Sequence, residues 1–496
     1  MTCVTDQLPQ GWRWVLPGDL ASRQTHSLGI GPFGSDLKVS DYTESGVPLV
    51  FVRNIRSGSF ALANQPHVSK EKAAALFAHR VLPGDLLITK MGEPPGDAFV
   101  YPANACEARM TADCIRLRVA HEVATPTFLM YATRSSVVRQ QIISATKGVA
   151  QKKISLDRYR SVRYPLPPLA EQHRIVATLD TQATRMDAAV ALLERVKANL
   201  KRARASVLKT AVEGRLVPTE AALARKERRD YEPGSALLAR MLTEHRARWT
   251  ESGGKGKYAS PAKFVPGALH ELPEGWVWTN LDNLLHQIEA GRSFAADNTP
   301  PQGTQVGIVK VSAVTWGRYQ EKESKTVHDQ RQINSGYFIH PGDFLFSRAN
   351  TIDLVGAAVI VDNTTRDIML SDKILRLHLP ENIKRWVLWV LRSQLGRKQI
   401  ESLSTGNQES MRNIGQERIK QIAIPLPPAT EQRRIVAEVD RRFSVLDAIE
   451  RTVEADLARC MTLRQAVLKC AFEGRLVPPE HSAAFHSVLG KPTYER

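Results

Sequence analysis

The amino-acid sequence predicts an α+β protein with two globular mixed α/β domains in a pseudo-twofold repeat, separated by two long antiparallel coiled-coil helices. Three observations predict this fold. Two segments recur with high identity at one shift of 260 residues, an apolar repeat of seven residues runs between them, and the remaining sequence mixes helical and strand periodicity. The 496 residues are enough for several domains of ordinary size.

The repeat is visible at both ends of the duplicated segment. PLPPLAEQHRIVATLD at 165–180 matches PLPPATEQRRIVAEVD at 425–440 at 11 of 16 positions, and SVLKTAVEGRLVP from 206 matches AVLKCAFEGRLVP from 466 at 10 of 13. Upstream, LPQGWRW and Pro-Gly-Asp of the first copy correspond to LPEGWVW and Pro-Gly-Asp of the second, with a drifting shift that marks loops of unequal length. We therefore predict two copies of a module of about 210 residues.

The repeat also sets the expected domain boundaries. They are a first domain at 1–164, a first helical region at 165–218, a basic, exposed and partly helical linker at 219–268, a second domain at 269–424, a second helical region at 425–479 and a tail at 480–496.

In each domain, alternating tryptophans near the start indicate a half-buried strand, and we expect all four to belong to the core: Trp12, Trp14, Trp276 and Trp278. The Pro-Gly-Asp motifs ending at Asp85 and Asp343 are turns, and each feeds a short apolar run that predicts a buried strand.

Each helical region carries matching start and stop signals. A Pro-Pro pair precedes the helix, and a glutamate lies in the first turn, where the helix dipole favours a carboxylate. A glycine and then a proline follow the expected end. These residues are Pro167, Pro168, Glu171, Gly214 and Pro218 in the first copy, and Pro427, Pro428, Glu431, Gly474 and Pro478 in the second.

Between these signals, apolar residues recur every seven positions, which is typical of a coiled-coil seam. The seam comprises Leu179, Met186, Leu193, Leu200 and Val207, then Val439, Leu446, Val453, Cys460 and Val467. Two matched seams can bury each other, and the domain between them lets the second helix return antiparallel. The alternative is an amphipathic helix lying on its own domain. A helix of about 40 residues spans roughly 60 Å.

Two loops of each domain carry side chains that suit contact with a nucleic acid. Five residues after each Pro-Gly-Asp aspartate comes a cation, Lys90 or Arg348, which suits either a structural ion pair or a phosphate or base contact. Loops of matching position just before the prolines, ATKGVAQKKI and STGNQESMRNI, suit contacts to phosphates and purine edges, or are merely solvated turns. The remaining candidates are Lys147, Gln151, Lys152 and Lys153 in the first domain, and Asn350, Thr405, Asn407, Gln408, Arg412 and Asn413 in the second.

Charge and cysteine usage narrow the class of protein. The net charge of +17 and the pI near 9.7 favour a polyanionic partner, although a merely basic protein has the same composition. The five cysteines form no CxxC pair, which indicates reduced thiols and a cytoplasmic location. No apolar stretch approaches the roughly 18 residues that a membrane helix needs, so we expect no membrane partner.

Motifs for self-contained catalysis are missing from the sequence. There is no GxxxxGK[ST] phosphate loop and no acidic or Asn residue directly before Pro-Pro-aromatic, as an amino-methyltransferase would show. Glu321, Glu323 and Lys325 imitate a nuclease ExK pair but lack an obvious partner aspartate, and no metal-ligand spacing is visible. We therefore expect no catalytic residue and no metal in this chain.

The PLPPxxEQxRIV helix start, the EGRLVP stop and the duplicated layout resemble the specificity (S) subunit of type I restriction-modification systems, which defend cells against foreign DNA. The resemblance covers nearly the whole chain. It implies two target recognition domains, each reading one half of an asymmetric bipartite site in double-stranded DNA. It also implies that the two helices space the domains and dock partner subunits.

The partners implied by this resemblance are two methyltransferase (M) subunits and two motor-nuclease (R) subunits. The M subunits would bind S-adenosylmethionine for adenine methylation, and the R subunits would use ATP and magnesium, so no cofactor is expected on this chain. The matched motif residues are candidates for the M interface, for a scaffold or for intrachain capping: Glu171, Gln172, Arg174, Glu431, Gln432 and Arg434. Base-reading residues do not transfer from the family, because its target recognition domains share little sequence.

Two other functions fit the same sequence. A coiled-coil scaffold joining two protein-binding domains predicts a weak dependence of binding on salt, whereas a DNA reader predicts a steep loss of affinity with salt. A solitary methylation system without an R subunit would use the same chain.

Overall fold

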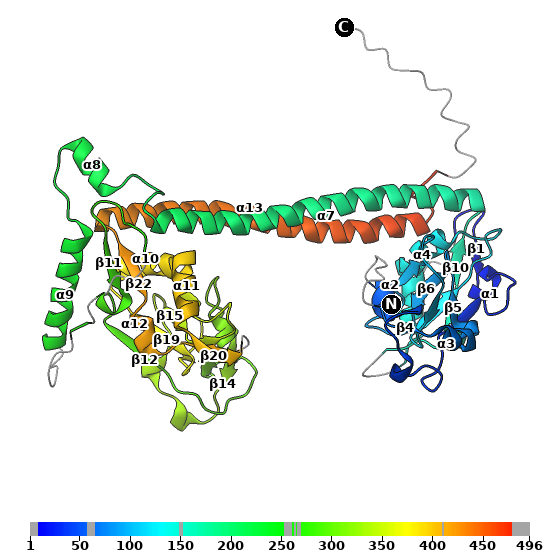
Figure 1. The fold of residues 1–496 in the computed structure, drawn as a ribbon, viewed down its shortest axis with the longest axis horizontal. Coiled ribbons are helices and arrows are strands. Elements are labelled where there is room, and N and C mark those ends of the chain that lie inside the picture. The colour runs from blue at the N-terminus through cyan, green and yellow to red at the C-terminus, as the bar shows by residue number, and fades with distance from the viewer. Residues whose placement is uncertain are drawn as a thin grey trace, which may run out of the picture. The chain divides into compact units, whose positions relative to one another are not determined.

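The computed structural model describes residues 8–56, 65–147, 152–251, 260–261, 264, 269–408 and 411–478. The chain divides into two compact units. The first unit combines residues 1–194 with 454–496, and the second unit comprises residues 195–453 (Figure 1). Each unit therefore contains one globular domain, the start of one long helix and the end of the other.

The two long helices are α7 (Leu169–Val212) and α13 (Ala429–Phe472), 44 residues each. Both begin directly after the Pro-Pro pair, as predicted. Both end just before the predicted glycine, which has a positive φ of 67° at Gly214 and 71° at Gly474. A side chain at either glycine would also meet a proline of the adjacent domain, because an added Cβ would lie 2.4 Å from Cγ of Pro273 or Pro9, respectively. These glycines both terminate the helices and allow a close approach to the domains.

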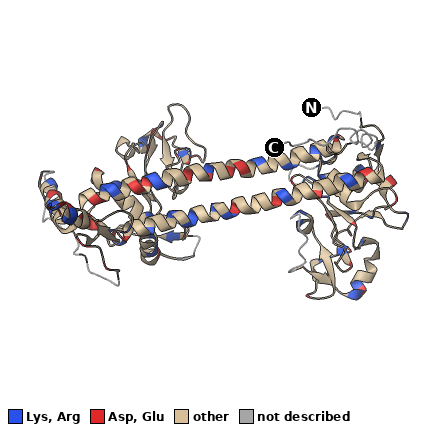
Figure 2. Ribbon diagram, turned by 90° about the horizontal axis from the view of Figure 1, so that it is seen from above, with Lys and Arg blue, Asp and Glu red and all other residues tan. Residues whose placement is uncertain are grey.

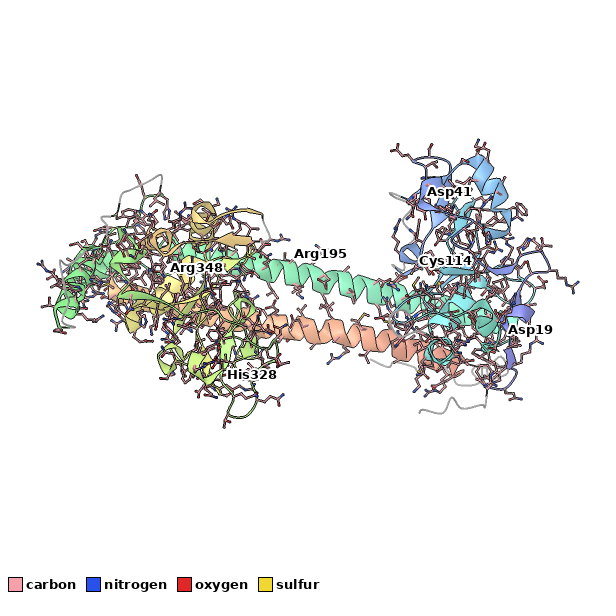
Figure 3. The ribbon with its side chains drawn as sticks, turned by 90° about the horizontal axis from the view of Figure 1, so that it is seen from below. Asp19, Asp41, Cys114, Arg195, His328 and Arg348 are labelled. Carbon is pink, nitrogen blue, oxygen red and sulfur yellow. The ribbon has the colours of Figure 1, made fainter. Side chains whose placement is uncertain are left out.

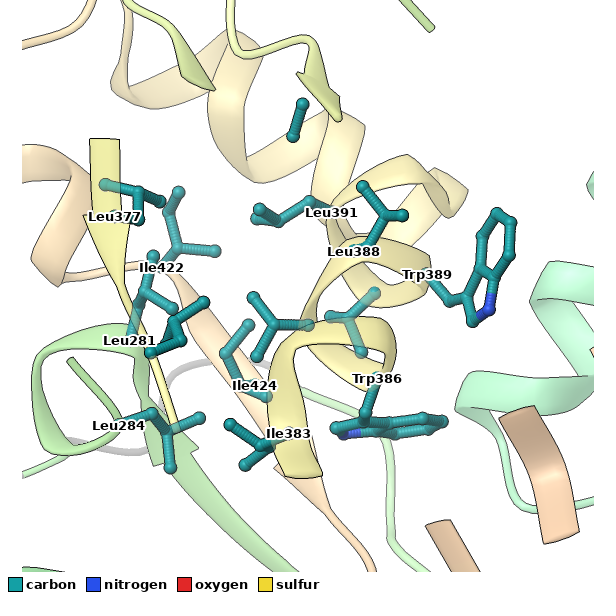
Figure 4. Close-up of a cluster of buried hydrophobic side chains, with 14 of the residues drawn as sticks. Leu281, Leu284, Leu377, Ile383, Trp386, Leu388, Trp389, Leu391, Ile422 and Ile424 are labelled. Atoms are coloured by element: carbon teal, nitrogen blue, oxygen red, sulfur yellow. The ribbon is translucent and has the colours of Figure 1, made fainter. Parts of the chain in front are cut away.

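Each long helix ends on the domain of the other repeat. The last turns of α13 join the core of the first domain, where the rings of Phe472 and Phe128 lie 5.3 Å apart. The last turns of α7 join the core of the second domain, which includes Val212 and the edge-to-face pair Trp276 and Trp386. Figure 4 shows part of this second core. The compact unit is therefore not the sequence repeat, because the helices are exchanged between the two copies.

Paired segments of α7 and α13 run antiparallel within each unit. In the second unit, Arg204 of α7 contacts Asp447 of α13 at 2.5 Å and Glu450 at 2.7 Å. In the first unit, Arg464 of α13 forms an ion pair with Asp187 of α7. Because Arg464 and Asp187 lie 260 residues from Arg204 and Asp447, the two units repeat one contact with the helices interchanged. Figure 2 shows the two charge signs interspersed along both helices.

The ten predicted seam positions are buried or half-buried, and none is exposed. Leu179, Met186, Leu193, Cys460 and Val467 lie in the first unit, and Leu200, Val207, Val439, Leu446 and Val453 lie in the second.

The described residues of the first domain form ten strands and six α-helices. The strands form sheets in the orders β2-β9-β6-β7, β4-β3-β8-β5 and β1-β10. Their bounds are β1 Arg13–Val15, β2 Leu28–Ile30, β3 Val47–Val50, β4 His67–Val68, β5 Arg80–Val81, β6 Leu86–Thr89, β7 Ala98–Val100, β8 Ala108–Met110, β9 Cys114–Leu117 and β10 Tyr164–Leu166. The helices are α1 Pro17–Leu20, α2 Val52–Arg56, α3 Lys70–Ala75, α4 Pro126–Arg134, α5 Ser136–Ser144 and α6 Leu156–Arg160.

The second domain repeats this plan, with β12-β19-β15-β17 in place of β2-β9-β6-β7. Its other sheets are β14-β13-β18, β16-β21-β20 and β11-β22. The strands are β11 Val277–Asn280, β12 Gln287–Ala290, β13 Gly307–Val309, β14 Ser324–Thr326, β15 Phe344–Ser347, β16 Ala349–Asn350, β17 Ala358–Ile360, β18 Ile368–Met369, β19 Ile374–His378, β20 Thr405–Gln408, β21 Met411–Asn413 and β22 Ala423–Leu426. The helices are α10 Glu381–Arg392, α11 Gln394–Leu403 and α12 Gln416–Lys420.

The strand predictions hold at the repeated motifs. Both Pro-Gly-Asp turns feed fully buried strands, β6 and β15. The tryptophan strand of each domain pairs with the strand that enters the Pro-Pro motif, so that Trp14 faces Pro165 and Trp278 faces Pro425. Trp12 and Trp276 are buried, as expected. Trp14 and Trp278 are only half-buried. Trp12 and Trp276 lie just before β1 and β11, so the two tryptophans of each domain are not two positions on one face of a strand.

The predicted linker is less exposed than expected. Residues 219–251 contain α8 (Glu220–Glu227) and α9 (Gly234–Glu251), and Leu237 and Met241 of α9 belong to the core of the second unit. The expectation of an exposed tether is wrong for this part, because an apolar face of α9 packs on the domain. Residues 252–259, 262–263 and 265–268 lie outside the described chain.

Candidate nucleic-acid interface

In the second domain, the two predicted loops lie side by side on one small sheet. Strand β16 follows Arg348 directly, and its Ala349 and Asn350 pair with Asn413 and Arg412 of β21. Strand β20 completes the sheet on the other side of β21. The backbone of Arg348 is fixed on both sides, since its N–H donates to the Lys373 carbonyl at 3.0 Å and its carbonyl accepts from Ile414 at 2.9 Å.

The first domain builds the same frame around Lys90. The Lys90 N–H donates to the Asp113 carbonyl at 2.8 Å, and its carbonyl accepts from Ile154 at 3.0 Å. β-Bridges join Lys153 to Met91 and to Lys147. Lys90 and Arg348 are therefore structurally equivalent, and each domain brings its two candidate loops together. Figure 3 labels Arg348 and, on β9, Cys114.

The side chains on the two frames differ in chemistry. In the second domain, Arg348 is half-buried and its Nε lies 3.4 Å from Oδ1 of the exposed Asn413. Arg412 instead braces the hairpin, donating to the carbonyls of Gly406 at 2.7 Å and Ser404 at 3.0 Å. Arg412 therefore stabilises the hairpin through hydrogen bonds within the protein, whereas Arg348 and Asn413 present polar atoms at the surface.

Two further candidates of the second domain make local contacts. The Asn350 Oδ1 accepts from the Thr351 N–H at 2.9 Å, and the exposed Thr405 donates to the Asn413 carbonyl at 3.2 Å. Asn407 and Gln408 belong to β20, and their side chains lie outside the described atoms.

The first domain presents exposed lysines, and one of them, Lys152, lines a cleft. Lys147, Lys152 and Lys153 are exposed, and Nζ of the half-buried Lys90 contacts the Ala112 carbonyl at 3.3 Å. The cleft, of about 530 Å³, is lined by Val52, Arg56, Met91, Gly92, Glu93, Asp113 and Lys152. Gln151 lies outside the described residues.

The ion-pair alternative for Lys90 and Arg348 has no support in the described residues. The aspartates of the Pro-Gly-Asp turns instead pair with an arginine that directly follows β9 and with an arginine of β19. Arg118 binds Asp85 through two contacts of 2.8 Å, and Arg376 Nε lies 3.0 Å from Asp343. Within the described chain, no ion pair is found for either Lys90 or Arg348. Both cations therefore remain available to a ligand.

The residues at the helix starts are built into the protein interior. Trp12 Nε1 donates to Glu171 Oε1 at 3.2 Å, and Trp276 Nε1 donates to Glu431 Oε1 at 2.9 Å. Both glutamates are buried, and burial raises the pKa of the Glu431 carboxyl, against the effect of its hydrogen bonds.

The neighbouring glutamines bond back to the proline motif that precedes each helix. Gln172 donates to the Pro167 carbonyl at 3.0 Å, and Gln432 donates to the Pro427 carbonyl at 2.7 Å. Both amides are buried. This geometry favours the scaffold alternative for Glu171, Gln172, Glu431 and Gln432.

Some residues of the interface were not singled out from the sequence. Arg56 and Asp113 line the cleft of the first domain, and Met411, 60% exposed, stands beside Arg412 in the second. Asp113 lies 260 residues before Lys373, whose carbonyl accepts from the backbone of Arg348. The shift of the repeat could therefore have pointed to Asp113 as a residue next to Lys90. Arg56 carried no such signal.

The candidate nuclease carboxylates serve the fold. Glu321 accepts hydrogen bonds from the backbone of Thr365 and Arg366, and Glu323 accepts from Ser312 at 2.6 Å. Among the described residues, no group of three His, Cys, Asp or Glu side chains is placed to hold a metal ion. No helix in the same part of the chain is both long and apolar enough to cross a membrane.

A family model and the most similar relatives point to the same protein family. The family model described as type I restriction modification DNA specificity domain matches residues 63–202 and 273–459. The specificity subunit of the type I restriction enzyme EcoEI from Escherichia coli is 24% identical, over 94% of this chain and 83% of its own length. The EcoKI specificity subunit from Escherichia coli strain K12 is 23% identical, over 95% and 90%.

A solved chain from work on complex assembly and conformational transition of the type I R-M system has a similar fold. The match has a TM-score of 0.57 at 20% identity, and it covers 95% of this chain and all of the other.

Proposed function

Because the chain belongs to the type I restriction-modification DNA specificity family, we propose that each of its two domains reads one half of an asymmetric bipartite DNA site. The observation that carries the proposal is the pair of equivalent frames around Lys90 and Arg348. One backbone arrangement presents lysines in one domain and an arginine beside an asparagine in the other. Two readers of one design with different side chains suit two different half-sites.

The second domain would read its half-site through Arg348 and Asn413. An arginine makes paired hydrogen bonds to O6 and N7 of guanine, and an asparagine makes them to N6 and N7 of adenine. Among the described residues, Arg348 contacts Asn413 through Nε, so its two terminal nitrogens could form the paired hydrogen bonds to guanine. The fixed backbone on either side of Arg348 limits the entropy lost on binding.

The first domain would combine attraction to phosphates with recognition in its cleft. Lys147, Lys152 and Lys153 supply exposed positive charge, which suits the sugar-phosphate backbone. Asp113 and Glu93 line the same cleft and can accept from an exocyclic amino group, as carboxylates do at cytosine N4.

The helices would set the spacing between half-sites. A helix of 44 residues is about 66 Å long, since each residue adds about 1.5 Å. By analogy with relatives named as specificity subunits of type I restriction enzymes, partner subunits would supply the chemistry. These partners would be two M subunits with S-adenosylmethionine and two R subunits with ATP and magnesium. This chain would then contribute recognition and no catalytic residue.

Base-resolution mapping of adenine methylation in host DNA, with the gene intact and deleted, tests the proposal. We expect deletion to abolish methylation at one bipartite asymmetric motif. If methylation is unchanged, binding of the purified chain to DNA at increasing salt decides whether it is a reader, because DNA binding through phosphates weakens steeply with salt. A flat salt response together with unchanged methylation would contradict the function.

A further inference from the structure

Arg56 places a positive charge at the cleft of the first domain. It is the last residue of α2, and its side chain is 53% exposed. Its Nε lies 3.4 Å from Oδ2 of Asp97, and Oδ1 of Asp97 accepts from Arg139 at 2.9 Å. No hydrogen bond or ion pair is found for the two terminal nitrogens of Arg56 in the described part of the chain. Asp97 therefore holds the inner edge of the guanidinium and leaves its outer end available to a ligand.

Gly92, in the loop that follows Lys90, lets this guanidinium lie against the backbone. A Cβ added at Gly92 would lie 2.5 Å from NH2 of Arg56 and 3.1 Å from the carbonyl oxygen of Pro94. The Gly92 N–H also donates to the Lys152 carbonyl at 3.3 Å, so the same loop contacts the segment on the other side of the cleft. A side chain at position 92 would push the guanidinium out of its place.

Asp113 supplies a hydrogen-bond acceptor in the same cleft. It is half-buried, and its backbone carbonyl is already used by the Lys90 N–H. For its carboxylate, no hydrogen bond or ion pair is found within the described chain. A carboxylate that loses its water on binding needs a donor in return. The cleft thus offers a ligand two free donor nitrogens on Arg56 and a free acceptor on Asp113.

A G·C base pair carries the complementary groups on its major-groove edge. Guanine presents the acceptors O6 and N7, which suit the two terminal nitrogens of an arginine, and cytosine presents the N4 amino group, which suits a carboxylate. An A·T pair lacks the two neighbouring acceptors of guanine. A phosphate would accept from Arg56 but would be repelled by Asp113, so this mixture of charges favours a base edge over the DNA backbone.

Resting on the proposed function of the chain as a DNA reader, we propose that Arg56 is a specificity-determining residue of the first domain. It donates to the guanine of one G·C base pair, and Asp113 accepts from the cytosine of that pair. The first half-site therefore contains a fixed G·C pair. The two domains would then read guanine with arginines from different places in the fold, Arg56 at the end of α2 and Arg348 directly after β15.

Binding of the full chain to a panel of DNA duplexes tests the proposal. The panel starts from the methylated motif of the natural chain and changes each base pair of both half-sites in turn. We expect the natural chain to lose about tenfold or more in affinity when one G·C pair of the first half-site becomes A·T. Arg56→Ala should reduce that loss to about twofold and leave the discrimination in the other half-site unchanged.

Arg53→Ala is the matched control for the loss of charge. Arg53 belongs to the same helix, but its guanidinium lies 4.4 Å from the ring centre of Phe51 and it does not line the cleft. Its removal should leave the discrimination at every position as it is. Gly92→Ala is a second variant of the site, because it keeps the charge of Arg56 and displaces the guanidinium. It should lose discrimination at the same G·C pair as Arg56→Ala. Thermal unfolding checks that each variant is folded.

The proposal is overturned if Arg56→Ala weakens binding to every duplex by the same factor, which is the behaviour of a phosphate contact. It is also overturned if Arg56→Ala and Gly92→Ala both keep the discrimination of the natural chain at every G·C pair. Failure of the proposed function would be a different result, because the natural chain itself would then discriminate at no position of either half-site.

Discussion

The two units of the molecule agree at the contacts that hold the two long helices and differ on the candidate DNA-binding surface. Trp12 and Glu171 repeat the bond of Trp276 and Glu431, and the ion pairs between α7 and α13 repeat with the helices interchanged. On the candidate DNA-binding surface, only the backbone repeats. After duplication, the contacts that hold the helices kept the same residue types in both copies. The side chains presented around Lys90 and Arg348 diverged.

This difference separates assembly from recognition. A scaffold that must present equivalent surfaces benefits from symmetry, whereas recognition of an asymmetric site requires two different readers. Substitutions at the repeated contacts should therefore affect stability in both units. Substitutions around Lys90 or Arg348 should instead affect the recognition of a single half-site.

The largest effect is expected at the buried glutamates. Glu431→Ala leaves the N–H groups of Trp276 and Glu220 without an acceptor, so the second unit should lose about 2–4 kcal/mol of unfolding free energy. Glu171→Ala removes one described bond and should cost the first unit about 1–2 kcal/mol. Urea denaturation followed by unit-resolved hydrogen exchange measures both. Equal losses would mean that the two helix starts are alike in strength.

The next effect distinguishes the two readers. Arg348→Ala should weaken binding to DNA with the correct second half-site by about 1–3 kcal/mol and should spare DNA in which that half is already altered. Lys90→Ala should weaken binding to all duplexes by a similar small factor, if Lys90 contacts phosphate. Binding to a panel of duplexes mutated in one half-site measures both, and thermal unfolding controls for folding. Uniform weakening by Arg348→Ala would contradict base reading.

The long helices were more predictable from the sequence than the candidate nucleic-acid interface. The repeat located both helices, because the Pro-Pro start and the glycine stop are local signals. It also identified Lys90 and Arg348 as equivalent. The antiparallel return of the second helix implies that each helix ends near the domain of the other copy. The repeat does not identify the core residues that a helix end contacts there, such as Phe128 beside Phe472. The role of Arg56 depends on the folding of distant loops around one cleft.

A smaller, pH-dependent effect should appear in the second unit, where α9 packs near His286. Burial lowers the pKa of His286 to about 4, and the neighbouring charges of Arg248 and His245 act in the same direction. In the unfolded chain the pKa of His286 is near 6.5, so the unfolded state binds the proton at a higher pH than the folded state does. The free energy of unfolding of the second unit should therefore fall as the pH drops from about 6.5 to 4.

Hydrogen exchange of residues 234–251 between pH 7 and pH 4, corrected for intrinsic rates, measures this loss. His286→Gln should flatten the dependence. A dependence that persists in the variant would assign it to other groups.

The smallest effect concerns the ion pairs between the helices. Arg204 contacts two carboxylates and is 24% exposed, whereas Arg464 contacts one and is 41% exposed. Arg204→Ala should cost about 0.5–1 kcal/mol and Arg464→Ala less than about 0.5 kcal/mol, with both losses reduced in high salt. Thermal unfolding at low and high salt gives the ranking, and the reverse order would contradict it.

The most direct test of the central claim, two independent readers on one symmetric scaffold, is methylation mapping after exchange of one domain. Residues 1–164 would be replaced by the corresponding domain of a relative, with both long helices retained. The account predicts a new methylated motif in which one half is changed and the other half and the spacing are kept. A motif changed in both halves, from a correctly assembled chain, would contradict it.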